Sequence, residues 1–181
     1  MKSPAASLRD FANESDRNRY YGHQHCNFDH NSDNQRSRPD VVVRGSGRSF
    51  LQKISSGNHW FQADEPVNAG GGDAAPDPYD YLMASLGACT SMMVGLQARN
   101  RKWPVENIAV SLRHSRIHAQ DCEECLTKNG MIDRIDVGIE LTGPLTSEQR
   151  AELMRVAANC PIHRALTHEI NVRLRGVSSD L

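Results

Sequence analysis

Cysteine is the residue type in this chain best suited to chemistry, and its five positions are unevenly spaced. Cys89 lies within a long apolar stretch, whereas Cys122 and Cys125 form a Cys-x-x-Cys pair in a polar one. These few, irregular cysteines do not fit the disulfide framework of a small secreted protein, and they indicate reactive or metal-binding thiols in a reducing compartment. The alternative for Cys89 is a small buried apolar side chain, which is what most free cysteines are.

The Cys-x-x-Cys pair admits three interpretations. It is a redox dithiol, or it binds a metal together with His118, or it lies in a surface loop where the thiols pair incidentally or stay free. A zinc site needs a fourth ligand that the sequence does not identify. No strand runs directly into Cys122 and no helix signal follows it, so a thioredoxin-like arrangement is not expected.

Composition limits the class of protein. The 181 residues suffice for one domain with a real core and a tail. The net charge of -1, with mixed signs, predicts neither nucleic acid nor an anionic membrane surface as a partner. No apolar run is long enough to span a membrane, and the N-terminal residues lack the apolar core of a signal peptide, so we expect a cytoplasmic protein.

The stretch that must position Cys89 is predicted to be a long helix. Asp77 can cap it, and Pro78 suits its first position. Large side chains recur at helical spacing, at Leu82, Leu86, Cys89, Met93 and Leu96. Other positions are small, and Gly87 and Gly95 each cost about 1 kcal/mol relative to alanine inside a helix. That cost predicts a close approach of another segment, and a central helix packed on several sides.

The remaining elements indicate an α+β fold with largely antiparallel sheets. Strands are predicted at 41–44, 49–54, 59–63, about 107–117, 135–141 and 170–174, with a short turn at 162–166 and a second helix starting from a capping-box pattern at Thr146. Residues 1–40 are polar and show no periodicity, so we expect a disordered extension before a folded domain at 41–176 and a tail at 177–181.

The loop Gly70–Gly72 lacks the Gly-Lys-Ser/Thr signature of a phosphate-binding loop and is expected to be a tight backbone passage.

Three segments carry a resemblance to a known family. They are Pro76–Thr90, which reads Pro-Asp-Pro-Tyr-Asp-Tyr-Leu-Met-Ala-Ser-Leu-Gly-Ala-Cys-Thr, the helix exit Lys102-Trp103-Pro104, and Asn159–Leu166, which reads Asn-Cys-Pro-Ile-His-Arg-Ala-Leu. Together they resemble the OsmC/Ohr family of osmotically inducible and organic-hydroperoxide-resistance proteins over roughly 41–176. The resemblance implies antiparallel sheets wrapped around a long central helix in an intertwined homodimer. The small residues of the helix agree, because a helix that is apolar on several faces needs more partners than one short chain supplies.

The resemblance also implies an activity. The better-characterised members are thiol peroxidases that reduce organic hydroperoxides in oxidative-stress defence, and we expect no cofactor. By motif, Cys89 would attack the peroxide and become a sulfenic acid, and Cys160 would condense with it to a disulfide that an external dithiol reduces. Cys122 and Cys125 would then be an accessory redox pair that relays electrons.

The chain departs from the family pattern where the thiolate would be activated. Peroxidase members carry an arginine before the central helix and an acidic residue ten positions ahead of the first cysteine. Here no arginine lies between Phe50 and Pro78, and Tyr79 occupies the acidic position. The pattern looks more like the OsmC-like branch whose substrates are poorly defined. Candidate groups to activate the thiolate are His59, Asp64, Glu65 and His163.

Two other functions stay open. A non-catalytic protein of the same fold would bind a small apolar or electrophilic molecule in the same cavity. A zinc-stabilised variant would use His118, Cys122 and Cys125 as ligands. Loss of thiols on mixing with an organic hydroperoxide would separate the enzyme from the binding protein, and metal content would decide on zinc.

Overall fold

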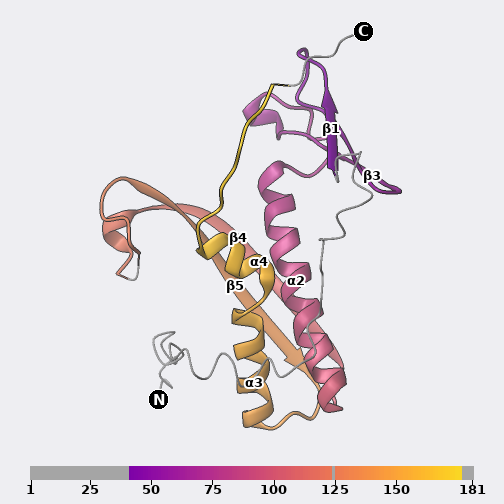
Figure 1. The fold of residues 1–181 in the computed structure, drawn as a ribbon, viewed down its shortest axis with the longest axis vertical. Helices are drawn as coiled ribbons and strands as arrows, with labels where there is room; N and C mark the ends of the chain where they lie inside the picture. The colour runs from indigo at the N-terminus through magenta and orange to yellow at the C-terminus, as the bar shows by residue number, and fades with distance from the viewer. Residues whose placement is uncertain (1–40, 124, 177–181) are drawn as a thin grey trace. The chain divides into compact units, whose positions relative to one another are not determined.

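The computed structural model describes residues 41–123 and 125–176. The expected extension at 1–40 and the tail at 177–181 lie outside the described residues. The elements in chain order are β1 (Val41–Gly45), β2 (Gln52–Ser56), β3 (His59–Ala63), η2 (Val67–Ala69), α2 (Pro78–Arg101), β4 (Asn107–His118), η3 (Ala119–Asp121), β5 (Met131–Thr142), α3 (Ser147–Ala158) and α4 (Pro161–Thr167) (Figure 1). This is the predicted α+β class, with antiparallel pairing in both sheets.

The first three strands form an antiparallel meander, as their turn signals predicted. β2 pairs with β1 on one side and with β3 on the other, where Ile54 lies opposite Phe61. Gly57, with a φ of 55°, supplies the left-handed residue in the turn between β2 and β3. The sheet meets the start of α2 at Tyr81, whose ring lies 5.3 Å from that of Phe61 between centroids and whose hydroxyl donates to the Gln62 carbonyl.

The predicted central helix is α2, and local signals set both of its ends. The Asp77 carboxylate accepts from the Asp80 amide at 2.8 Å, the Asp80 carboxylate accepts from the Asp77 amide, and Pro78 occupies the first turn. The helix stops at Lys102, which takes a left-handed conformation with a φ of 54°. Within the described ranges, no helix is long and apolar enough to cross a membrane.

One side of α2 is buried within this chain and the other is not. The buried positions follow helical spacing and are Leu86, Gly87, Thr90, Val94 and Ala98. Most of the larger side chains, including Cys89 and Met93, are only partly covered, and Met92 is 71% exposed. The small residues make the contact because they let β4 approach: a Cβ added to Gly87 would lie 2.8 Å from Leu112 Cδ1.

The second sheet is a long hairpin that packs with α2 and α3. β4 and β5 pair continuously from Asn107 opposite Thr142 to His118 opposite Met131. α3 begins with the predicted capping box at Thr146 and lies alongside α2 (Figure 1). The core between them contains Val94 and Ala98 of α2 and Leu153 and Ala157 of α3. Cys89 is therefore carried on a helix that is fixed from one side by a strand and a second helix.

The segment after α3 is a new helix rather than the expected turn. α3 ends at Ala158, and Cys160 then caps α4, with Pro161 in the first turn. Proline suits this position because its fixed φ is helical and the missing amide would have no partner there. The prediction was wrong because this proline starts a helix instead of only interrupting one.

The expected closing strand is also wrong. Ile170, Val172 and Leu174 lie in a segment without secondary structure, and Leu174 is 95% exposed. The apolar alternation that suggested a strand is present, but pairing is a non-local property. No strand of the described chain pairs with this segment.

Candidate redox-active site

Two thiols from distant parts of the sequence meet beside α2. Cys89 lies in the middle of the helix, and Cys160 lies between α3 and α4. Both are free cysteines; Cys160 is completely buried and Cys89 is partly exposed. The Cys160 side chain is close enough to form a hydrogen bond with Cys89 and to influence its charge. The structure therefore places side by side the two thiols that the family resemblance singled out.

Backbone amides at the start of α4 are directed at both sulfurs. The His163 amide donates to Cys160 Sγ at 3.3 Å, and the Ile162 amide lies close enough to the Cys89 thiol to lower its pKa. First-turn amides have no partner within their own helix, so they are available to these acceptors. The Thr90 hydroxyl, one residue along α2 from Cys89, adds a further donor at 3.5 Å from Cys160 Sγ. The site thus consists of two sulfurs and three neutral donors.

Burial raises the pKa of the Cys89 thiol above its ordinary value. The Ile162 amide lowers this pKa because it favours the thiolate, whereas the neighbouring Cys160 thiol raises it further. None of these influences comes from a cationic side chain. The raised pKa means that this environment favours the neutral thiol of Cys89.

The four candidate activating residues do not bring a side-chain charge to the thiols. His59 is exposed at the start of β3, and Glu65 lies partly exposed in the loop that follows β3. His163 reaches the site, but through its backbone amide. What sequence reasoning missed is that the donors are amides. The available signal was the Cys160-Pro161 pair, because proline is frequent at the first position of a helix and the residue before it is then the cap.

The fourth candidate, Asp64, organises the glycine-rich loop instead. Its buried carboxylate accepts from the amides of Glu65 at 2.9 Å, Gly72 at 3.1 Å and Ala74 at 3.1 Å. These bonds, led by the one from Ala74, hold the pKa of Asp64 below its usual range. A Cβ added to Gly71 would overlap the Glu65 carbonyl oxygen. The predicted tight backbone passage is confirmed.

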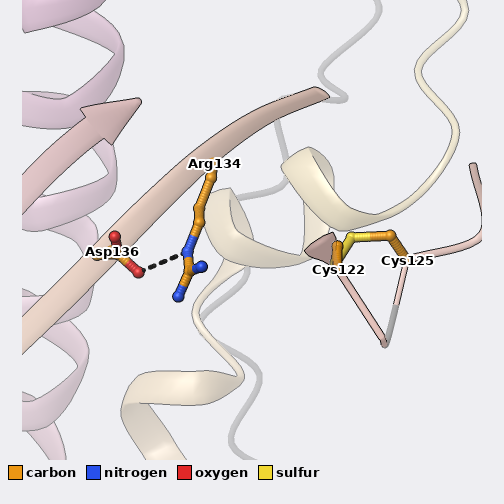
Figure 2. Close-up of a disulfide and its surroundings, with 4 residues drawn as sticks. All are labelled: Cys122, Cys125, Arg134 and Asp136. Atoms are coloured by element: carbon orange, nitrogen blue, oxygen red, sulfur yellow. Dashed lines mark hydrogen bonds and ion pairs between the residues drawn. A yellow bond between two sulfur atoms is a disulfide. The ribbon is translucent and has the colours of Figure 1, made fainter. Parts of the chain in front are cut away.

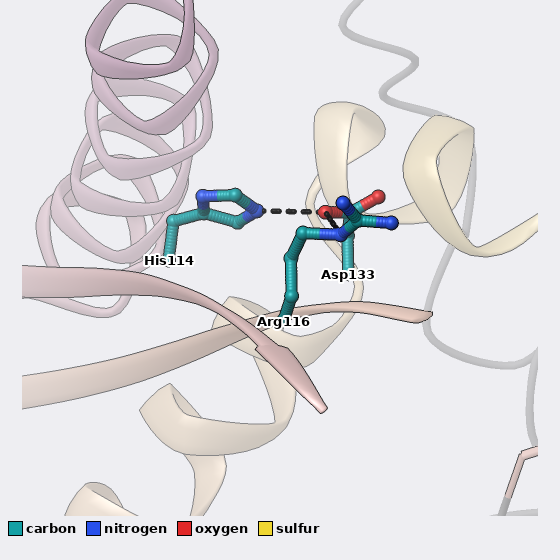
Figure 3. A network of polar contacts seen from close by, with 3 residues as sticks. All are labelled: His114, Arg116 and Asp133. Carbon is teal, nitrogen blue, oxygen red and sulfur yellow. Dashed lines mark hydrogen bonds and ion pairs between the residues drawn. The ribbon is translucent and has the colours of Figure 1, made fainter. Parts of the chain in front are cut away.

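Tyr79, which occupies the acidic position of the family pattern, stacks on His114. The ring centroids lie 4.2 Å apart and the planes differ by 12°. His114 Nε2 lies 3.0 Å from Asp133 Oδ1, and Arg116 Nε lies 3.9 Å from the same oxygen (Figure 3). These residues come from α2, β4 and β5, so this cluster fastens the start of α2 to the hairpin. The sequence signal was limited to the alternation that puts His114 and Arg116 on one face of β4.

Cys122 and Cys125 are joined by a disulfide, with their Cα atoms 5.4 Å apart (Figure 2). Their bonded sulfurs are not available as thiolate ligands, and His118 lies exposed at the end of β4. Among the residues that the structure describes, no group of three or more His, Cys, Asp or Glu could hold a metal ion. This arrangement is compatible with the redox and the surface-loop interpretations, and zinc binding by the reduced loop stays a separate hypothesis.

The two cysteine pairs lie on different elements. Gly87 faces Leu112 and Tyr79 stacks on His114, so the helix begins beside the later part of β4 and runs back along the strand. Cys122 follows the end of that strand. The disulfide therefore lies in the loop of the hairpin, whereas Cys89 lies in the middle of α2. A relay between the pairs stays a prediction.

The fold is α+β, and its long helix and Cys-Pro turn bring two free thiols together. These features define a class of dithiol protein. A family model described as OsmC-like protein matches residues 70–175, more than half of the chain. The chain belongs to this OsmC-like family. No curated protein sequence matches it.

Solved structures share the fold. An osmotic stress induced and detoxification response protein from Psychrobacter arcticus matches with a TM-score of 0.56 at 17% identity, over 71% of this chain and 88% of that one. An OsmC-like protein from Mycoplasma pneumoniae matches with a TM-score of 0.55 at 18% identity, over 72% and 88%. An organic hydroperoxide resistance protein OsmC from Legionella pneumophila matches with a TM-score of 0.52 at 20% identity, over 70% and 87%. At such identities the likeness establishes the fold alone.

Proposed function

We propose that this chain is a cytoplasmic thiol-dependent peroxidase that reduces organic hydroperoxides and serves in defence against oxidative stress. The proposal rests chiefly on one observation: Cys89 and Cys160 are free thiols, close enough for Cys160 to influence the pKa of Cys89. A second thiol within reach is what allows a cysteine to pass through a sulfenic acid without further oxidation. The name of the Legionella pneumophila relative, an organic hydroperoxide resistance protein, supports the same choice of substrate.

Cys89 is the attacking residue in this proposal, because it is the partly exposed member of the pair. Its thiolate attacks one peroxide oxygen, the O–O bond breaks, and the other oxygen leaves with a proton as an alcohol. Cys89 is oxidised to a sulfenic acid by this step and the peroxide is reduced by two electrons. The Ile162 amide is placed to stabilise the thiolate before the attack.

Cys160 is the resolving residue. Its sulfur attacks the sulfenic sulfur of Cys89, a disulfide forms, and the hydroxyl leaves as water. The His163 amide and the Thr90 hydroxyl both donate to Cys160 Sγ and hold this sulfur in place beside Cys89. An external dithiol then returns two electrons through a mixed disulfide and restores both thiols.

A homodimer is part of the proposal. The face of α2 that carries Met92 is open in the single chain, and the alternating apolar residues Ile170, Val172 and Leu174 are 56%, 76% and 95% exposed. A second copy would cover the helix face and give the C-terminal segment a strand to pair with. Light scattering on the purified protein tests this, because a monomer at micromolar concentration would contradict it.

The test of the activity is thiol loss after mixing the reduced protein with an organic hydroperoxide. A variant with Cys26→Ser, Cys122→Ser and Cys125→Ser serves as the starting protein, so that only Cys89 and Cys160 are followed. We expect rapid loss of two thiols per chain, release of the corresponding alcohol, and no reaction after Cys89→Ser. Cys160→Ser should lose one thiol and leave a sulfenic acid that a cyclic 1,3-diketone traps.

The outcome that would contradict the proposal is an unchanged thiol content over minutes. That result would favour the second candidate, a protein that binds a small apolar or electrophilic molecule without turnover. The raised pKa of Cys89 is the observation on the side of this alternative, since a neutral thiol is a poor nucleophile.

A further inference from the structure

The disulfide between Cys122 and Cys125 lies in the loop that connects β4 to β5 (Figure 2). The ladder of the hairpin ends at His118 opposite Met131, and the Ala119 amide donates to the Gly130 carbonyl at 2.8 Å just beyond it. The base of the loop is thus closed by backbone hydrogen bonds. The disulfide sits outside this closure and does not hold the two strands together.

The bond is poorly placed to act as a structural staple. Its two cysteines are only 3 positions apart in the sequence, and both belong to one loop. The stabilisation that a disulfide gives by restricting the unfolded chain grows with the number of residues that it encloses. A ring this small therefore stabilises the folded state only weakly. Opening it would leave every element of the fold connected as before.

Its surroundings fit contact with another protein. Cys122 and Cys125 are each partly exposed, and Leu126 beside them is 98% exposed. An apolar side chain next to a reachable disulfide offers a contact for a macromolecule that approaches it. Cys160 at the other pair is completely buried and offers no such access.

Charge near the disulfide sets a direction for electron flow. Asp121 and Glu123 are exposed carboxylates directly beside Cys122. Negative charge disfavours the thiolate that reduction of the disulfide would produce. When the reduced form of a dithiol–disulfide pair is not stabilised, the dithiol donates its electrons readily. The reduced pair is therefore suited to pass electrons on rather than to keep them.

We propose that Cys122 and Cys125 form a second redox site, at which the chain exchanges two electrons with a dithiol protein. A thiolate of that protein attacks one sulfur of the Cys122–Cys125 bond, forms a mixed disulfide, and releases the other sulfur as a thiolate. The partner's second thiol then attacks the partner sulfur of the mixed disulfide, and the bond to the loop cysteine breaks. The partner leaves as a disulfide, and Cys122 and Cys125 are left as two thiols with the two electrons and two protons gained. This site does not depend on peroxide chemistry at Cys89.

The test begins with full-length protein oxidised by diamide, so that it needs no peroxidase activity. The protein is equilibrated with mixtures of reduced and oxidised dithiothreitol, and then with a reduced Cys-x-x-Cys dithiol protein. Thiols are alkylated and located by peptide mass spectrometry. We expect Cys122 and Cys125 to be reduced and reoxidised reversibly while the circular dichroism spectrum stays unchanged. With the dithiol protein lacking its second cysteine, a mixed disulfide should form at Cys122 or Cys125.

Matched variants locate the exchange. Cys122→Ser and Cys125→Ser each remove the loop disulfide, and each should abolish the mixed disulfide that the oxidised wild-type loop forms with the dithiol protein. Cys89→Ser should still form that mixed disulfide. A disulfide that resists the dithiol protein until the chain unfolds would overturn the proposal, as would an equal yield of mixed disulfide in the chain with both serines. One equivalent of zinc bound to the reduced loop would also overturn it in favour of a metal site. Failure of the peroxide reaction alone would affect only the proposed function.

Discussion

The two cysteine pairs of this chain are opposites in almost every physical respect. Cys89 and Cys160 come from different parts of the fold and remain free thiols, with Cys89 in the middle of α2 and Cys160 in the turn between α3 and α4. Cys122 and Cys125 come from one loop, are bonded, and lie on the surface. The first pair is brought together only by the fold, whereas the second is adjacent because of its spacing alone. Tertiary structure is thus needed for the chemistry of one pair and not for that of the other.

The difference explains which pair can react with what. A small hydroperoxide needs only a narrow approach to Cys89, and donors around Cys160 are fixed by α4. A protein-sized reductant needs a more open surface, and of the two pairs the one in the hairpin loop lies beside the 98% exposed Leu126. The two proposals above are independent, since the second does not depend on peroxide chemistry at Cys89.

The largest expected contrast is in stability. Leu153→Ala should lower the free energy of unfolding by about 2–5 kcal/mol, because this side chain has 0% exposure in the core between α2 and α3. Leu126→Ala, at a side chain that is 98% exposed beside the surface disulfide, should change it by less than about 0.5 kcal/mol. Urea unfolding followed by circular dichroism measures both. Equal losses of unfolding free energy in the two variants would show that the hairpin loop is packed, and would contradict the expected contrast between core and loop.

Thiol accessibility should differ next most strongly. In the fully reduced native protein, a bulky maleimide should modify Cys122 and Cys125 at least about a hundredfold faster than Cys160, since a buried thiol reacts only when the structure opens locally. Mass spectrometry of quenched time points gives the rates, and the same reaction in denaturant is the control. Similar native rates at the two pairs would contradict the burial of Cys160.

The donor from Thr90 tests the buried pair more finely. Thr90→Val keeps the shape of the side chain but removes the hydroxyl that donates to Cys160 Sγ, and should lower the free energy of unfolding by about 1 kcal/mol. It should also slow disulfide formation after sulfenic acid has formed at Cys89. Thr90→Ser keeps the hydroxyl and is the matched control. If the two variants resolve the sulfenic acid at the same rate, the hydroxyl has no part in the step.

The smallest expected effect is on pH-dependent stability. Burial raises the pKa of Cys89 in the folded chain, so the folded state holds this proton more tightly than the unfolded state does. The resulting stability is fully present below the unfolded pKa and is lost as the pH rises through the folded pKa. Between pH 8 and pH 10 the wild-type Tm should therefore fall by up to about 2 °C more than that of Cys89→Ser. A larger fall in the variant would reverse the assigned direction.

Local signals in the sequence predicted most of the fold. The caps at Asp77 and Thr146, the proline at Pro78 and the alternation in the hairpin each act within a few residues, and each element appears where expected. The closing strand at Ile170 failed because a strand needs a partner, and pairing is not encoded in the segment itself.

The site was predictable in part for the same reason. The family motifs named Cys89 and Cys160, but the donors that surround them depend on how α4 meets α2. The search for an activating charge on Asp64 missed that three backbone amides already satisfy this carboxylate. Backbone donors are a property of every residue except proline, so only the Cys160-Pro161 pair, as a helix-start signal, pointed to them.

The most direct test of the central claim is a map of cross-links after one turnover. The chain with Cys122→Ser and Cys125→Ser is reduced, mixed with one equivalent of an organic hydroperoxide, alkylated and digested for mass spectrometry. The account predicts a single new disulfide, between Cys89 and Cys160. Cys89 oxidised to a sulfinic or sulfonic acid with Cys160 still alkylated, or both thiols unchanged, would contradict it.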